Sequence, residues 1–165
     1  MQNSISQYLE GIPNTQMQNA VRPVLNAIGD RVSTQSLTSA GLVIKTGGSA
    51  LAKTGASAYY GVVKGKLVTV GAGVDMPALS GTITAGKYNV FCFFIDSAST
   101  VTSVKGIEGA AIGNVVFPSI PEGNAMIGFL LITYASTFTG GTTALDTATT
   151  VYVNTVGAFD PSINL

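Results

Sequence analysis

The sequence predicts a mainly β fold, an antiparallel β-sandwich or jelly roll preceded by an N-terminal helical arm. From residue 42 onward, short apolar runs recur at spacings of about 8 to 12 residues, with glycine, asparagine, serine and proline between them. This pattern is typical of antiparallel strands joined by turns. Helical periodicity occurs only within the first forty residues. Because no helices alternate with the strands, a parallel α/β sheet is not expected.

The 165-residue length fits one domain of ordinary size with an appended arm. We expect an N-terminal arm and helix at 1–38, a β-sandwich domain at 39–157 and a C-terminal tail at 158–165. The tail is expected either to fray or to lie on a neighbouring chain, with Phe159 as one of its apolar anchors.

The arm contains one helical pattern, an apolar stripe formed by Met17, Val21, Leu25, Ile28 and Val32. Pro23 is expected either to bend this helix or to mark the start of its regular part. A helix interrupted in this way depends on packing its apolar face against something else. Two partners are open, namely the chain's own β domain, or copies of the chain or a host surface. Val21, Leu25, Ile28 and Val32 are therefore candidate interface residues.

Nine segments are candidate strands, residues 42–45, 58–63, 66–70, 79–84, 88–95, 100–105, 113–117, 125–134 and 150–155. Turn-forming residues lie between them. The pair Lys64-Gly65 predicts a tight hairpin, and Ala85-Gly86-Lys87 predicts a hairpin turn between two strands.

The segment Tyr88 to Asp96 is apolar on both of its alternating faces. Successive side chains of a strand point to opposite sides, so Val90, Cys92 and Phe94 share one face. The opposite face carries Phe91, Phe93 and Ile95. An antiparallel sheet with one wet face alternates apolar and polar residues instead. The pattern predicts two dry neighbours, one of them the domain's own core and the other a second sheet, a helix or another protein. Because another chain is one of these alternatives, the three residues of the second face are candidate interface residues.

The composition favours association with other proteins. Charged residues make up 10% of the chain, against about 25% in a typical soluble domain, and the net charge is zero. Low net charge favours association over repulsion between molecules. Nucleic acid is not an expected partner, because phosphate binding relies on clustered lysine and arginine. The longest apolar run is far shorter than the roughly 20 residues that cross a bilayer, so no membrane is expected either.

Catalytic chemistry finds little support in the sequence. There is no histidine, which removes the commonest general base and metal ligand, and the one cysteine, Cys92, is most simply a small buried side chain. The spacing from Gly81 to Lys87 matches a phosphate-binding loop, but Tyr88 stands where the motif needs serine or threonine and a strand-like segment follows. We therefore expect no enzyme activity, no metal and no cofactor.

Six of the eight acidic side chains are scattered through the chain after residue 40, most of them next to glycine, proline or serine. We expect them to cap turns through hydrogen bonds to the backbone. They are Asp75, Asp96, Glu108, Glu122, Asp146 and Asp160.

Four stretches resemble β-rich structural proteins of tailed-bacteriophage virions, most of all head decoration, or cement, proteins. They are Thr84-Ala85-Gly86-Lys87-Tyr88-Asn89-Val90, Phe94-Ile95-Asp96-Ser97-Ala98-Ser99-Thr100-Val101-Thr102, Val115-Val116-Phe117-Pro118-Ser119-Ile120-Pro121-Glu122 and Ala125-Met126-Ile127-Gly128-Phe129. The resemblance implies a β-sandwich that binds the major capsid protein on the assembled shell, is expected as a homotrimer, and stabilises the shell by bridging capsid subunits. It also implies a place on the capsid surface. The missing secretion signal and disulfides indicate assembly in the host cytoplasm.

Two alternatives remain open. A receptor- or carbohydrate-binding module of a phage fibre would need an exposed pocket on the loops near Tyr59, Asp75 or Asp146. A glycan hydrolase would need two carboxylates about 5 to 10 Å apart in one cleft.

Overall fold

The computed structural model describes residues 15–159, apart from the side chains of residues 16–18, 30 and 31, and shows a mainly β chain with antiparallel sheets. An N-terminal helix, α2 (Thr15–Val32), precedes the strands. The strands are β1 (Gln35–Ser36), β2 (Val43–Ile44), β3 (Ala52–Lys53), β4 (Tyr59–Val63), β5 (Lys66–Val70), β6 (Thr82–Ile83), β7 (Tyr88–Asp96), β8 (Val101–Lys105), β9 (Asn124–Thr133), β10 (Phe138–Thr139) and β11 (Thr149–Asn154).

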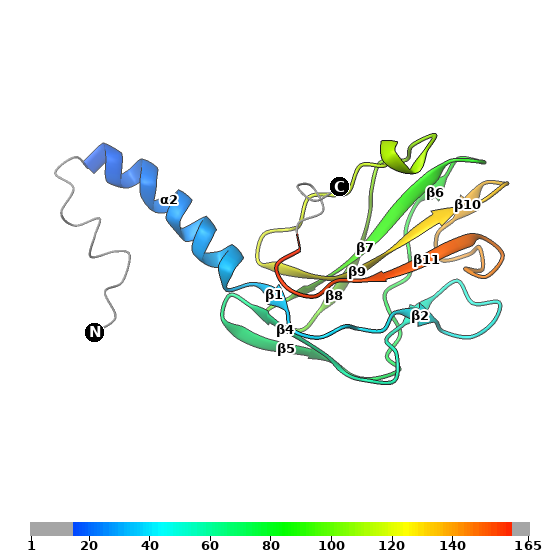
Figure 1. The fold of residues 1–165 in the computed structure, drawn as a ribbon, viewed down its shortest axis with the longest axis horizontal. Coiled ribbons are helices and arrows are strands. Elements are labelled where there is room, and N and C mark those ends of the chain that lie inside the picture. The colour runs from blue at the N-terminus through cyan, green and yellow to red at the C-terminus, as the bar shows by residue number, and fades with distance from the viewer. Residues whose placement is uncertain (1–14, 160–165) are drawn as a thin grey trace.

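Two sheets account for most of the strands. The larger sheet has the order β11-β9-β7-β8, and the smaller has the order β1-β4-β5. The pairs β2-β3 and β10-β6 form two further short ladders. In Figure 1 the larger sheet lies above the smaller one, and α2 extends away from both.

The main core lies between these sheets because each contributes one apolar face. Tyr59 and Val68 come from the smaller sheet, while Phe91, Phe93 and Leu130 come from the larger one. All five are almost completely buried.

A β-bulge in β9 keeps its apolar residues aligned with this core. Phe93 is opposite Gly128 and Phe94 is opposite Met126, so Ile127 is an extra residue in β9. Ala125 faces the main core before the bulge and Leu130 faces it afterwards. Strict alternation would have turned one of them to the other side of the sheet.

A second, smaller core covers the opposite face of the larger sheet. It contains the fully buried Val90, Cys92 and Phe94 of β7. The cover comes from the chain itself, through Val115, Phe117, Ile120 and Phe159. The predicted division of β7 into two apolar faces is therefore confirmed. Of the neighbours that the sequence left open, segments of the same chain cover both faces, so β7 does not support an interface with another chain.

Most predicted strands occur where expected, and β5 matches its prediction residue for residue. The predicted hairpin is confirmed, since Lys64 and Gly65 join β4 to β5 with positive φ angles of 50° and 76°. The strand predicted at 113–117 is wrong. A 3-10 turn, Ile112–Asn114, occupies its start, and only Val116 makes an isolated bridge, to Ile107.

Candidate attachment site

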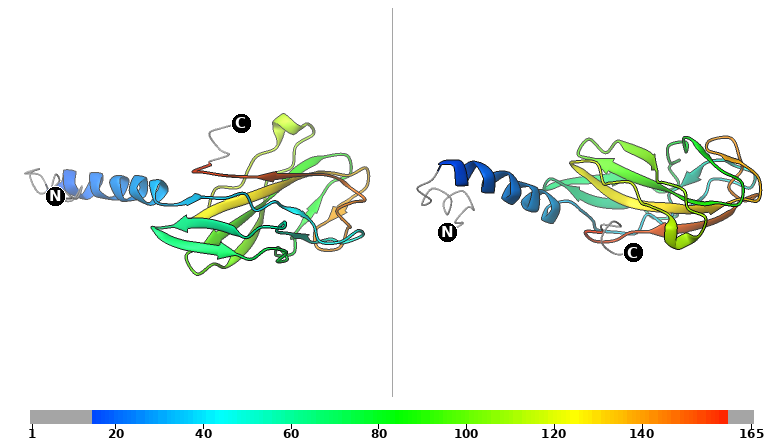
Figure 2. Two further views of the ribbon diagram at one scale, coloured as in Figure 1. Left: turned by 60° about the horizontal axis from the view of Figure 1, so that its bottom comes forward. Right: turned by 90° about the horizontal axis from the view of Figure 1, so that it is seen from above.

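The apolar stripe of α2 is open to solvent at its C-terminal end. Ile28 is 54% exposed and Val32 is 72% exposed, while Val21 and Leu25 are half-buried. Met17 belongs to the residues whose side chains are not described. Val24, which the predicted stripe omitted, is 57% exposed and extends the apolar surface. Figure 2 shows the helix projecting from one end of the molecule.

Pro23 lies inside α2, as the sequence allowed. The helix continues on both sides of it, from Thr15 to Val32, so the proline does not end the element. Proline removes one backbone donor from a helix interior and lowers its stability. The helix is therefore a weak element by itself, and a partner on its apolar face would stabilise it.

The C-terminal end of α2 is tied to the β4-β5 hairpin. The Gly65 amide donates to the carbonyl oxygen of Ser33 at 3.1 Å. The Lys64 amide donates to the hydroxyl oxygen of Thr34 at 3.0 Å. Gln35 and Ser36 follow directly as β1 and pair with β4. The helix thus enters the smaller sheet through a short junction, and residues 35 and 36, which the sequence placed in the arm, belong to this sheet.

Lys64 also reaches the turn before β9. Its ammonium nitrogen lies 3.7 Å from a carboxylate oxygen of Glu122. A Cβ atom at Gly123 would lie 2.9 Å from Cε of Lys64, so glycine leaves room for the lysine side chain. The hairpin is therefore in contact with both the end of α2 and the turn before β9.

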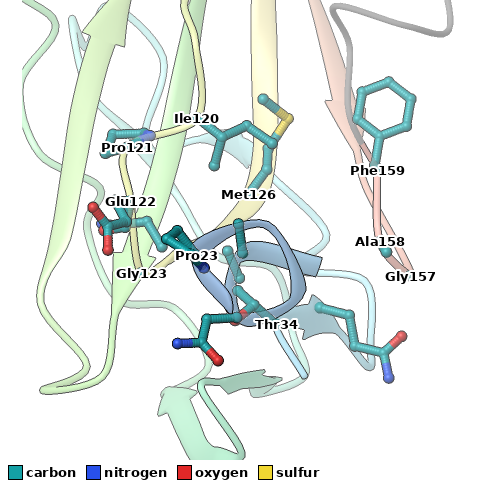
Figure 3. A pocket seen from close by; sticks show the side chains of 15 residues that line it. Pro23, Thr34, Ile120, Pro121, Glu122, Gly123, Met126, Gly157, Ala158 and Phe159 are labelled. Carbon is teal, nitrogen blue, oxygen red and sulfur yellow. The ribbon is translucent and has the colours of Figure 1, made fainter. Parts of the chain in front are cut away.

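A groove of about 480 Å³ lies between α2 and the β sheets. In Figure 3 the Pro121–Gly123 turn and the segment from Gly157 to Phe159 stand on opposite sides, with Met126 between them. From the helix, the groove is lined by Pro23, Asn26 and Ala27.

These three helix residues show which way α2 is turned. Successive helix residues are about 100° apart, so Pro23, Asn26 and Ala27 lie on the side opposite Val21, Leu25, Ile28 and Val32. The helix therefore directs its other face toward the groove and its apolar stripe away from the sheets. The chain's own β domain therefore leaves Ile28 and Val32 exposed.

Three of the predicted interface residues are not at the surface. Phe91, Phe93 and Ile95 are each 0% exposed in the main core. Their prediction as contact residues is wrong, because β4 and β5 cover this face within the same chain. The support that β7 gave to a homotrimer is removed with them.

Phe159 packs against its own chain. Its ring is stacked on that of Phe129, with centroids 6.5 Å apart and an angle of 18° between the planes. It therefore forms one wall of the groove and covers the smaller core. The other predicted parts of the tail, residues 160–165, lie outside the described residues.

The acidic side chains contact turns and neighbouring lysines. The Asp96 carboxylate accepts hydrogen bonds from the amides of Ala98 and Thr100, and that of Asp146 accepts one from the Gly48 amide. These contacts confirm the predicted turn caps. Asp75 instead pairs with Lys45. Asp160 lies outside the described residues.

Glu108 holds the turn that resembled a phosphate-binding loop. Its carboxylate accepts bonds from the amide and hydroxyl of Thr84, at 2.9 and 2.7 Å, and from Lys87 at 3.1 Å. The two bonds from Thr84, followed by the bond and charge of Lys87, lower the pKa of Glu108 to about 2. The segment joins β6 to β7, so the predicted turn is confirmed. The predicted hairpin is wrong, because β6 pairs with β10 while β7 pairs with β8 and β9.

Three residues mark the loops on which a carbohydrate-binding module would need an exposed pocket. Tyr59 is 0% exposed, and Asp75 and Asp146 make the internal contacts described above. Burial raises the pKa of the Cys92 thiol to about 12, which keeps it protonated and confirms its role as a buried side chain. Within residues 15–159, no group of three acidic or cysteine side chains is placed to hold a metal ion.

Comparisons with known proteins give no relative. No protein-family model matches the chain, and no significant match occurs among curated proteins or solved structures. No helix within residues 15–159 is long and apolar enough to cross a membrane.

Proposed function

We propose that this chain is a non-enzymatic structural protein of a phage virion, a decoration protein that attaches to the assembled capsid through α2. The observation that carries the proposal is the apolar stripe of α2, which faces away from the chain's own sheets. Val24, Ile28 and Val32 expose more than half of their surface. Exposed apolar surface of this kind marks a site of contact with another protein.

The way α2 is held supports the same function. Hydrogen bonds of Ser33 and Thr34 join the end of the helix to the β4-β5 hairpin, so a force on the helix is transmitted to the smaller sheet. A protein that binds only the assembled shell stabilises the shell by mass action. This function requires no catalytic side chain. The two larger sheets on either side of one core support a β-sandwich, and a jelly roll is part of the same proposal.

The test is binding to assembled shells of the source phage. A chain lacking residues 1–32 keeps Ser33, Ser36 and every strand, so it should retain its β circular dichroism. A longer deletion, to residue 38, would remove β1 and the buried Ser36. We expect the full chain to sediment with assembled shells but not with free capsid subunits, and the shortened chain to remain in the supernatant. Sedimentation of the shortened chain with shells would overturn the proposed attachment.

A further inference from the structure

The sheets end at several edge strands, and most of these are covered. The β1 edge bonds with Gly157 through both backbone groups of Ser36. On β8, the Ser103 hydroxyl donates to the carbonyl oxygen of Ala78 at 2.9 Å. On β5, the Thr69 amide donates to the Ser99 hydroxyl at 3.4 Å. The chain therefore contacts each of these edges with another segment of its own.

On β11 another segment contacts a side chain, since the Leu42 amide donates to Oδ1 of Asn154 at 2.8 Å. The backbone groups along the outer edge of β11 can be identified from the pairing with β9. The Thr155 amide donates to the carbonyl oxygen of Ile127, next to β9 residue Gly128 on the paired side. Along an antiparallel ladder, the backbone groups of successive residues point alternately toward the paired strand and away from it. Val153 and Val151 therefore bond toward β9, while the backbone groups of Thr150, Tyr152 and Asn154 point outward. Within residues 15–159, no hydrogen bond satisfies these outward backbone groups. Figure 2 shows β11 at the margin of the larger sheet.

The sequence of β11 also lacks the features that prevent edge pairing. Native edge strands are protected by lysine, proline or a bulge. The six residues of β11, Thr-Thr-Val-Tyr-Val-Asn, include no charge and no proline, and their pairing with β9 is continuous. By comparison, β5 begins with Lys66 and β8 ends with Lys105.

We propose that β11 pairs antiparallel with β11 of a second copy of this chain, joining the two larger sheets across a two-fold axis at Tyr152. In this register, Tyr152 lies opposite itself and Thr150 lies opposite Asn154. Each outward residue then donates and accepts one backbone hydrogen bond.

The side chains of β11 suit this register. Val151, 49% exposed in the single chain, is placed beside Val153 of the second copy on one face of the joined sheet. Close cross-strand pairs of β-branched residues stabilise an antiparallel sheet. A second copy fits better than an unrelated strand because the segment is nearly symmetric about Tyr152, with valine on each side.

The test is the mass of the full chain in solution, measured by light scattering over a range of concentrations. We expect a dimer for the native chain and a monomer for Val151→Lys, which places a charge at the joint. The matched control is Val74→Lys, at a valine of similar exposure (44%) in a loop, and it should remain dimeric. A native chain that is monomeric throughout, a Val151→Lys variant that still dimerises, or a Val74→Lys variant that is monomeric would overturn the proposal.

The register has its own test. Mild oxidation should link Tyr152→Cys into a covalent dimer, because residue 152 meets itself at the axis, while Thr150→Cys should remain unlinked. The native Cys92 is fully buried and does not interfere. Linking of Thr150→Cys alone would overturn the axis at Tyr152.

Discussion

The phenol oxygen of Tyr59 lies 2.7 Å from the hydroxyl oxygen of Ser36 in a fully buried contact. The Ser36 hydroxyl donates its one proton to the carbonyl oxygen of Met126 at 2.6 Å, so Tyr59 is the donor to Ser36. The Thr155 hydroxyl also donates to this carbonyl, at 2.8 Å. The network satisfies a carbonyl beside the β9 bulge and joins β4, β1, β9 and the segment after β11.

Tyr59→Phe tests this network. The variant removes one buried neutral hydrogen bond but keeps the bond from Ser36 to Met126, so we expect a loss of about 1 kcal/mol in unfolding free energy. For a chain of this size, that loss lowers the Tm by about 3 °C. The measurement is urea or thermal unfolding followed by circular dichroism.

Tyr60→Phe is the matched control, since the neighbouring tyrosine is 43% exposed and its hydroxyl makes no hydrogen bond within the described structure. Its stability should equal that of the native chain. An equal loss in both variants would mean that the Tyr59 hydroxyl does not stabilise the fold.

The lowered pKa of Glu108 predicts how the stability of the fold changes at acidic pH. Its pKa falls from the usual 4.5 to about 2 in the folded chain, so the folded carboxylate binds protons less readily than the unfolded one. Its contribution to stability is therefore fully present above about pH 4.5 and is lost as the pH falls through about 2. The chemical shift of the Glu108 carboxyl carbon should titrate near pH 2.

Glu108→Gln checks the same linkage through stability. The native chain should exceed the variant in unfolding free energy above pH 4.5, and the difference should shrink as the pH falls toward 2. A Glu108 that titrates at its usual value, or a difference that does not change with pH, would contradict the account of this turn.

The longer elements were predictable because their signals are local. The alternation in Lys66–Val70 and the spacing of Val21, Leu25, Ile28 and Val32 each identify an element from its own residues. The short strands β1, β3 and β10 were missed, since two residues carry no measurable period.

The errors came from contacts that are distant in sequence. Nothing near Phe91 or Phe93 indicates that β4 and β5 cover them, and nothing near Val90 indicates Phe117 and Phe159. A buried face has the same composition whether its own chain or another one covers it. The strand predicted at residues 113–117 is absent for a related reason. Gly109 packs so closely on Asn114 that a Cβ atom at residue 109 would lie 2.5 Å from the Asn114 backbone. This contact accompanies a 3-10 turn instead of a strand.

The stripe of α2 is the central claim, and the most direct measurement is binding of Ile28→Asp to assembled shells. Asn19→Asp is the control, because it adds the same charge at an exposed helix position on the face opposite the stripe. We expect Ile28→Asp to lose sedimentation with shells while its unfolding transition stays unchanged, and Asn19→Asp to bind like the native chain. Native binding by Ile28→Asp would contradict attachment through α2.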